Sequence, residues 1–224
     1  MKTHHAPYLT QLPSLAVAFV IASLACADGQ DAAKANAILL RATSPYEDMV
    51  DSALAKNTAG VTKALAAADK SAAGVKAVLP APAVSKFDSL VQAIHESAAG
   101  NKHPAIAANA VEVFRLLIDN LRADGLKEPR EVSLLDYAGF KLRVLSAAEQ
   151  PDWEAMRKTV ADAAAWWEAI KAKVADKGLR DAFNSTIRGL QAASKTENLP
   201  MLNFAAQMDL DLVDLLEAHF KHKP

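Results

Sequence analysis

The sequence predicts an all-helical fold, arranged as an antiparallel helical bundle. Alanine is abundant, whereas only 8 of the 224 residues are glycine. Apolar residues recur at intervals of three and four, the spacing of one helix face, and the alternation typical of strands is nearly absent. Proline, glycine and acidic residues separate the periodic segments. The chain is therefore expected to be a series of helices joined by short turns.

The helix boundaries follow from these breaks. Ser44 followed by Pro45 is typical of an N-cap with proline at the first helical position. LPAP at 79–82 and ENLP at 197–200 mark other helix ends. The segments between breaks predict helices over 45–56, 59–78, 82–99, 104–123, 131–148, 152–176, 179–194 and 199–220, and residues 31–43 are compatible with a short extra helix.

A weak internal repeat divides these helices into two sets of four. Three residue pairs match within similar patterns: Phe87 with Phe183, Ser89 with Ser185, and Pro104 with Pro200. Short links make successive helices antiparallel neighbours, so we expect two tandem four-helix bundles, over 28–124 and 125–224. One larger helical domain built from the same helices is the alternative.

Residues 1–27 have the pattern of a signal peptide. A basic residue precedes an apolar run, LPSLAVAFVIASLA, that is too short to span a bilayer. The small residues ACA at 25–27 fit a cleavage site before Asp28, which predicts a periplasmic or secreted protein. Lipid attachment at Cys26 is the weaker alternative, because Ser23 stands where a large aliphatic residue is usual. No second apolar segment is long enough for a transmembrane helix.

The composition excludes several classes of function. The single cysteine lies in the predicted signal peptide, so the mature protein is expected to lack disulfides and thiol ligands. The formal net charge is −1 and no basic cluster is present, which argues against nucleic-acid partners. Motifs for covalent haem, di-iron sites, zinc hydrolases, phosphate loops and serine hydrolases are absent. We predict no cofactor and favour a non-enzymatic protein, although a Ser-His-Asp site would leave no local motif.

Four histidines of the expected mature chain leave a divalent metal site open. His95 lies at the edge of its helix's apolar stripe, and His103 opens the next helix. Their joint ligation of a metal is geometrically strained, so a boundary histidine and a helix-terminal histidine are the favoured interpretation. His219 and His222 lie three residues apart near the C-terminus and suit a loosely held ion, although a solvated helix end is the simpler interpretation.

One predicted helix carries a charged face, and another carries two adjacent tryptophans. The charged face is expected to be solvated and laced with weak ion pairs. It carries Glu112, Arg115, Asp119 and Arg122. Trp167 shares the apolar stripe of its helix, whereas Trp166 points to one side and is a candidate for an interface or a pocket rim.

The last helix carries three aspartates that face different ways. On a helical wheel Asp211 and Asp214 face solvent, whereas Asp209 lies in the middle of the apolar stripe. The residues expected to widen that stripe are Phe204, Met208 and Leu215. A lone buried carboxylate is unfavourable, and Lys141 lies in the apolar stripe of the expected neighbouring helix. We therefore predict a buried Lys141–Asp209 ion pair, joined by the Tyr137 hydroxyl, that fixes helix register or lines a polar cavity.

Together these features favour an exported, non-enzymatic helical-bundle protein that binds a small ligand or another envelope protein. The candidate binding residues are Lys141, Asp209, Tyr137 and Trp166. One alternative is a purely structural or protein-interaction domain. Another is a metal-handling protein that uses carboxylates and histidines, namely His95, His103, His219 and His222.

Overall fold

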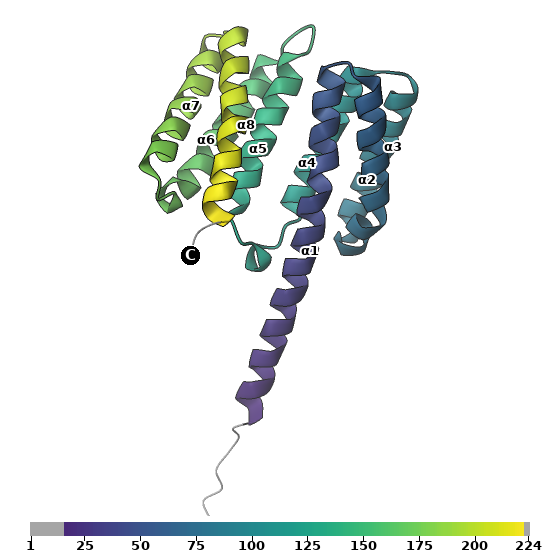
Figure 1. Ribbon diagram of the computed structural model, residues 1–224, viewed down its shortest axis with the longest axis vertical. Coiled ribbons are helices and arrows are strands. Elements are labelled where there is room, and N and C mark those ends of the chain that lie inside the picture. The colour runs from purple at the N-terminus through teal and green to yellow at the C-terminus, as the bar shows by residue number, and fades with distance from the viewer. Residues whose placement is uncertain (1–15, 222–224) are drawn as a thin grey trace, which may run out of the picture.

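The computed structural model describes the backbone of residues 16–221 and the side chains of residues 30–221, and this part of the chain is helical without strands (Figure 1). Its helices are α1 (Ala16–Leu54), α2 (Thr58–Val78), α3 (Ala81–Ala99), α4 (His103–Asp119), α5 (Arg130–Ser146), α6 (Trp153–Ile170), α7 (Lys177–Lys195) and α8 (Leu199–Lys221), with short 3-10 turns η1 (Ala123–Gly125) and η2 (Lys171–Lys173). The predicted all-helical fold is confirmed. The side chains of the predicted signal peptide, Cys26 included, and residue His222 lie outside the described residues. None of the described helices combines the length and apolarity needed to cross a bilayer.

Helix α1 runs without interruption through Pro45. The predicted helix start at this position and the separate helix over 31–43 are therefore wrong. A proline inside a helix removes one backbone hydrogen bond, because it has no N–H to donate to the carbonyl four residues earlier. Its neighbours Ala42, Tyr46 and Met49 are nevertheless buried in the core. Packing of this helix face outweighs the local preference for a break.

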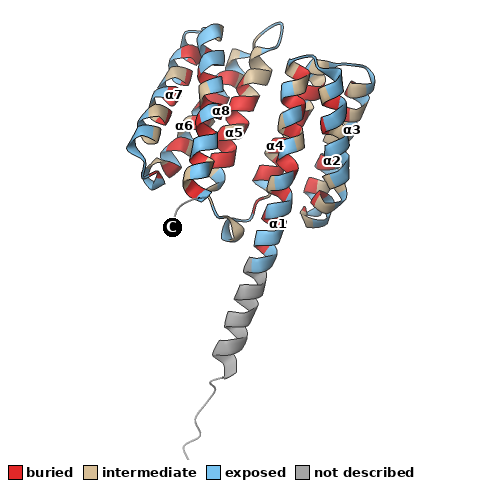
Figure 2. Ribbon diagram, in the orientation of Figure 1, coloured by how far each residue is buried: buried red, intermediate tan, exposed pale blue. Residues whose placement is uncertain are grey.

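The helices pack in two groups that follow chain order. Helix α1 packs against α2 and α4, and α3 packs against α4; in the second group α5 packs against α6 and α8, and α7 packs against α8. We call α1–α4 the N-terminal half and α5–α8 the C-terminal half. The halves meet where α4 packs against α5. Figure 2 shows buried residues on the inward sides of these helices and long exposed faces on α2 and α7.

Helix α5 contributes to the apolar cores of both halves. Its residues Leu134, Tyr137 and Phe140 join the core of the N-terminal half, together with Leu210 of α8. The opposite side of α5 joins the core of the C-terminal half. The buried residues of α5 consequently surround the helix: Val132, Ser133, Leu134, Leu135, Tyr137, Ala138, Gly139, Phe140 and Leu142.

Trp167 lies in the core of the C-terminal half, as its place on the apolar stripe predicted. Its ring stacks on Phe183 with the ring centroids 4.5 Å apart. The indole N–H donates a hydrogen bond to Asn184 Oδ1 at 2.7 Å, which satisfies the polar atom of this otherwise apolar side chain.

The apolar stripe of α8 is narrower than predicted. Phe204 is 69% exposed and Leu215 is 55% exposed, so the prediction that they widen the buried stripe is wrong. Met208 is half-buried. Helix α8 packs against α5 and α7, and side chains at the flanks of its stripe reach neither neighbour.

Three helix ends carry a residue other than glycine in the left-handed conformation. Lys56, Asn101 and Glu197 have φ values of 54°, 51° and 54°. After Glu197, the Asn198 N–H bonds the Ala193 carbonyl of the last helical turn at 2.9 Å, and equivalent bonds close the other two turns. This geometry favours glycine, because a Cβ is strained at positive φ.

We predict that Glu197→Gly raises the free energy of unfolding by about 1 kcal/mol relative to Glu197→Ala, because glycine relieves the left-handed strain. The comparison with alanine removes the Glu197–Arg157 ion pair from both proteins, and this pair is about half exposed on each side. Urea unfolding followed by circular dichroism measures the difference. Equal stability of the two variants would contradict the predicted strain.

Candidate functional site

The junction between the halves holds one cation between two aromatic rings. The Arg115 guanidinium of α4 lies 5.0 Å from the ring centre of Tyr137 on α5 and 5.1 Å from that of Trp166 on α6. Arg115 Nε also donates to both carboxylate oxygens of Asp119 at 2.9 Å. A cation–π contact contributes about 0.5–2 kcal/mol, depending on its desolvation. Trp166 therefore lies at the junction and helps to join α6 to α4.

Lys141 pairs with a residue of α4 and not with Asp209 of α8. Its ammonium group donates to Glu112 Oε1 at 2.6 Å, across the contact between α4 and α5. The predicted Lys141–Asp209 ion pair is therefore wrong. The prediction that this face of α4 is solvated is wrong for Glu112 and Arg115, which contact α5 and α6, whereas the expected ion pair within the face is present between Arg115 and Asp119. Burial, and after it the charge of Glu112, raises the pKa of Tyr137 to about 12.

Asp209 is buried, as predicted, but neither of its carboxylate oxygens has a hydrogen-bond partner among the described residues. It faces Gly139 of α5. A Cβ added to this glycine would lie 3.1 Å from Asp209 Oδ2 and 2.5 Å from Leu210 Cδ2, so the missing side chain lets α5 and α8 approach closely. Burial raises the pKa of Asp209 well above its ordinary value, which favours the protonated carboxyl in the folded protein.

A small polar cavity of about 180 Å³ lies where α1, α5, α8 and the segment before α5 meet. We call it the carboxyl pocket, because each of these four elements contributes one acidic side chain. They are Glu47, Glu128, Asp136 and Glu217. The other lining residues are Leu40, Thr43, Phe114, Ser133 and Lys221. Lys221 donates to Glu217 Oε2 at 2.6 Å, and Glu128 Oε2 is buried without a hydrogen-bond partner among the described residues.

The carboxyl pocket favours protonated acids. Burial raises the pKa of Glu47 to about 6, and the charges of Glu217 and other acidic neighbours add to this effect. Burial also raises the pKa of Asp136 well above its ordinary value, with further contributions from Glu47, Glu217 and Asp209. Desolvation and mutual repulsion act in the same direction here, since acidic groups converge with little compensating positive charge.

A mostly apolar cavity of about 330 Å³ lies at the other end of the junction. The end of α1, the start of α4 and the end of α5 surround it, and small side chains leave its space open. The lining residues are Ala53, Leu54, Lys56, His103, Pro104, Ala107, Ala108, Val144, Leu145, Ala147 and Ala148. We call this space the alanine cavity. Its charged or ionisable lining side chains are Lys56 and His103, and none of the residues around it is acidic.

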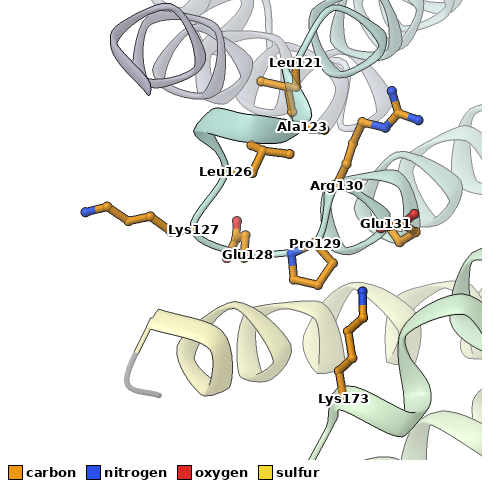
Figure 3. A pocket seen from close by; sticks show the side chains of 9 residues that line it. All are labelled: Leu121, Ala123, Leu126, Lys127, Glu128, Pro129, Arg130, Glu131 and Lys173. Carbon is orange, nitrogen blue, oxygen red and sulfur yellow. The ribbon is translucent and has the colours of Figure 1, made fainter. Parts of the chain in front are cut away.

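An open polar hollow of about 460 Å³ follows the segment that links the halves (Figure 3). Figure 3 shows that the Lys173 side chain extends toward Pro129. Glu128, on the linking segment, lies between this pair and Leu126. Lys127 points away from this group. The hollow joins side chains of both signs on an exposed surface, which gives it little selectivity for a ligand.

The histidines are not brought together. His95 Nε2 lies 3.0 Å from Asp69 Oδ1, and His103 Nε2 lies 3.5 Å from Thr58 Oγ1. His219 Nε2 accepts a hydrogen bond from the Ala175 N–H at 3.3 Å. Across the described side chains, no group of three or more histidine, cysteine, aspartate or glutamate residues has an arrangement that could hold a metal ion.

Sequence reasoning missed both cavities. The carboxyl pocket combines acidic residues from four separate elements, and each of them alone resembles an ordinary surface charge. Asp136 gave the one usable signal, since it lies between the apolar residues Leu135 and Tyr137. Comparison of the chain with protein-family models, curated proteins and solved structures finds no match.

We predict that Asp209→Asn becomes progressively more stable than the unmodified chain as the pH rises from about 4. The folded state holds the Asp209 proton more tightly than the unfolded state, so the unmodified chain loses stability between the ordinary pKa and the raised one. The gain is about 1.4 kcal/mol per pH unit over that window, because one pKa unit corresponds to this free energy.

Urea unfolding of both proteins between pH 4 and pH 8 measures the slope. Asp211→Asn, on the exposed face of the same helix, is the matched control and should follow the unmodified chain. Parallel stability curves for Asp209→Asn and the unmodified chain would show that the Asp209 carboxyl keeps an ordinary pKa.

Proposed function

We propose that the protein is an exported, non-enzymatic binding protein that holds a small apolar molecule in the alanine cavity. The single observation that supports this proposal is the shape and chemistry of the cavity, which is about 330 Å³ and almost entirely apolar. Small-molecule sites are typically concave and apolar, with a few polar groups that orient the ligand. The carboxyl pocket and the open polar hollow along the linking segment lack this apolar lining.

The position of the alanine cavity supports the same function. It is lined by α1 and α4 of the N-terminal half and by α5 of the C-terminal half, and ligand sites often lie where helical units meet. We interpret the halves as the tandem four-helix bundles of the weak repeat, with the site at their junction. Export is inferred from residues 1–27 alone, and an N-terminus at Asp28 in the exported protein would support it.

The alanine side chains give this proposal a direct test. Ala108 lines the cavity but is itself exposed on α4, so a larger residue there fills the cavity without disturbing the core. We predict that an eight-carbon chain, offered as octanoate or as 1-octanol, binds the unmodified protein, and that Ala108→Leu weakens this binding at least about tenfold.

Isothermal titration calorimetry measures the binding. Ala169→Leu, at an exposed position of α6 away from the cavity, is the matched control and should bind as the unmodified protein does. If neither eight-carbon compound binds, or if Ala108→Leu binds as well as Ala169→Leu, the cavity is not the binding site.

A second candidate function is protein interaction through α8. Met201, Phe204 and Leu215 are 40%, 69% and 55% exposed, and Met208 lies between them along the helix. An apolar stripe of this kind on a surface helix suits a contact with another protein. If it mediates self-association, sedimentation velocity should show a concentration-dependent increase in mass that Phe204→Ser abolishes; a concentration-independent monomer would exclude self-association.

Metal handling is less well supported than either of these functions. His95, His103 and His219 each engage a different partner on a different part of the molecule. A divalent ion would have to break these contacts and draw the histidines together from separate helices. The proposed apolar ligand requires no such rearrangement.

A further inference from the structure

We propose that the ligand of the alanine cavity is an amphiphilic anion, such as a medium-chain carboxylate, with its tail among the alanines and its charged group beside Lys56 and His103. This inference rests on the proposed function, because it specifies the ligand class for the same cavity. The charges that line the cavity carry the argument.

The ionisable side chains in the cavity wall are all basic. Lys56 and His103 are its ionisable side chains, and its remaining lining residues are apolar. The nearest acidic group along α1 is Asp51, which accepts a hydrogen bond from Arg143 Nη1 at 2.6 Å and is thereby neutralised. An anionic group in the cavity would therefore lie beside the Lys56 ammonium, with the nearby Asp51 carboxylate already paired to Arg143.

His103 has unused hydrogen-bonding capacity. Its Nδ1 is buried and has no partner in the described structure, while Nε2 has a single long contact of 3.5 Å to Thr58 Oγ1. A buried polar atom without a partner is unfavourable. A small rotation of the ring toward a bound carboxylate would provide that partner, and a protonated imidazole would add a charge-assisted hydrogen bond.

The backbone around the cavity contributes helix ends of both polarities. His103 begins α4, and no side chain caps this helix start. The partial positive charge of the α4 N-terminus supports an anion, whereas the C-terminal ends of α1 and α5 carry partial negative charge, so the side chains of Lys56 and His103 decide the preference. Lys56 itself is held in the left-handed turn after α1, so its side chain starts from a fixed backbone position beside the cavity.

The opposite wall of the cavity determines which apolar group the ligand can carry. Ala107, Ala108, Ala147 and Ala148 present only methyl groups, and Val144 and Leu145 complete a surface without hydrogen-bond donors. An unbranched chain or a small ring buries apolar area there, whereas a polyol or a peptide would leave polar groups unpaired. The combination of one charged corner and one methyl-lined wall matches an amphiphile.

The test compares three probes of the same chain length: octanoate, 1-octanol and octylamine. We expect octanoate to bind at least about tenfold more tightly than 1-octanol, and octylamine to bind more weakly than both, because a charge-assisted hydrogen bond is worth more than about one factor of ten. Titration calorimetry at low ionic strength measures the three affinities.

Two variants assign the preference to the cavity. Lys56→Gln keeps the side-chain Cβ and the turn but removes the charge, and His103→Gln keeps a polar group at the helix start. Each should reduce the preference for octanoate over 1-octanol several-fold, measured as the ratio of the two affinities within the same variant. Lys63→Gln, at an exposed position of α2, is the matched control and should keep the full preference.

The outcomes separate this inference from the proposed function. Equal binding of octanoate and 1-octanol, tighter binding of octylamine, or an octanoate preference that persists in both Lys56→Gln and His103→Gln would overturn the anionic class and leave the apolar site standing. Absence of binding by all three probes would overturn the proposed function itself, and the inference with it.

Discussion

Helix α5 has almost no face left for water, and the rest of the molecule is arranged around this fact. An ordinary bundle helix buries one stripe and exposes the other. Helix α5 instead packs against α4, α6 and α8, so Tyr137 and Phe140 enter one core while Leu135 and Leu142 enter the other. Gly139 completes the arrangement, because its missing Cβ is what allows α8 to come so close.

This burial explains where the polar residues of α5 are found. Lys141 forms an ion pair with Glu112 on α4, because the other sides of α5 are packed against neighbouring helices. Asp136 instead faces the carboxyl pocket, where other acids converge on it. On one side of the junction the charged groups are paired, and Arg115 lies between aromatic rings. On the other side, acidic residues outnumber basic ones.

The sequence was informative where local pattern decides the outcome. The period of the apolar residues predicted the all-helical fold, and the helical wheel placed Asp209 in the core and Asp211 on the surface, as observed. Each of these predictions requires only the pattern within one helix and the presence of one neighbouring helix. The wheel could not reveal that α5 packs against α4 as well as α8, so it assigned Lys141 to Asp209, whose carboxylate has no partner among the described residues.

Other features escaped prediction because several elements decide them together. Pro45 resembles a helix start, yet α1 continues through it, since the residues on either side are held in the core. The carboxyl pocket needs four elements and the alanine cavity needs three, so neither leaves a motif in any single segment. Exposure of Phe204 and Leu215 likewise reflects the absence of a neighbour on that side of α8 among the described helices.

The left-handed turn at Lys56 has a consequence for anyone who improves this protein. A search for more stable variants would replace Lys56 early, because glycine suits that backbone better than any residue with a side chain. The same substitution would remove a positive charge from the wall of the alanine cavity. Stability and the proposed selectivity for an anionic ligand would then favour different residues at position 56. Glu197 occupies the same kind of turn far from the cavity, and there the two aims do not conflict.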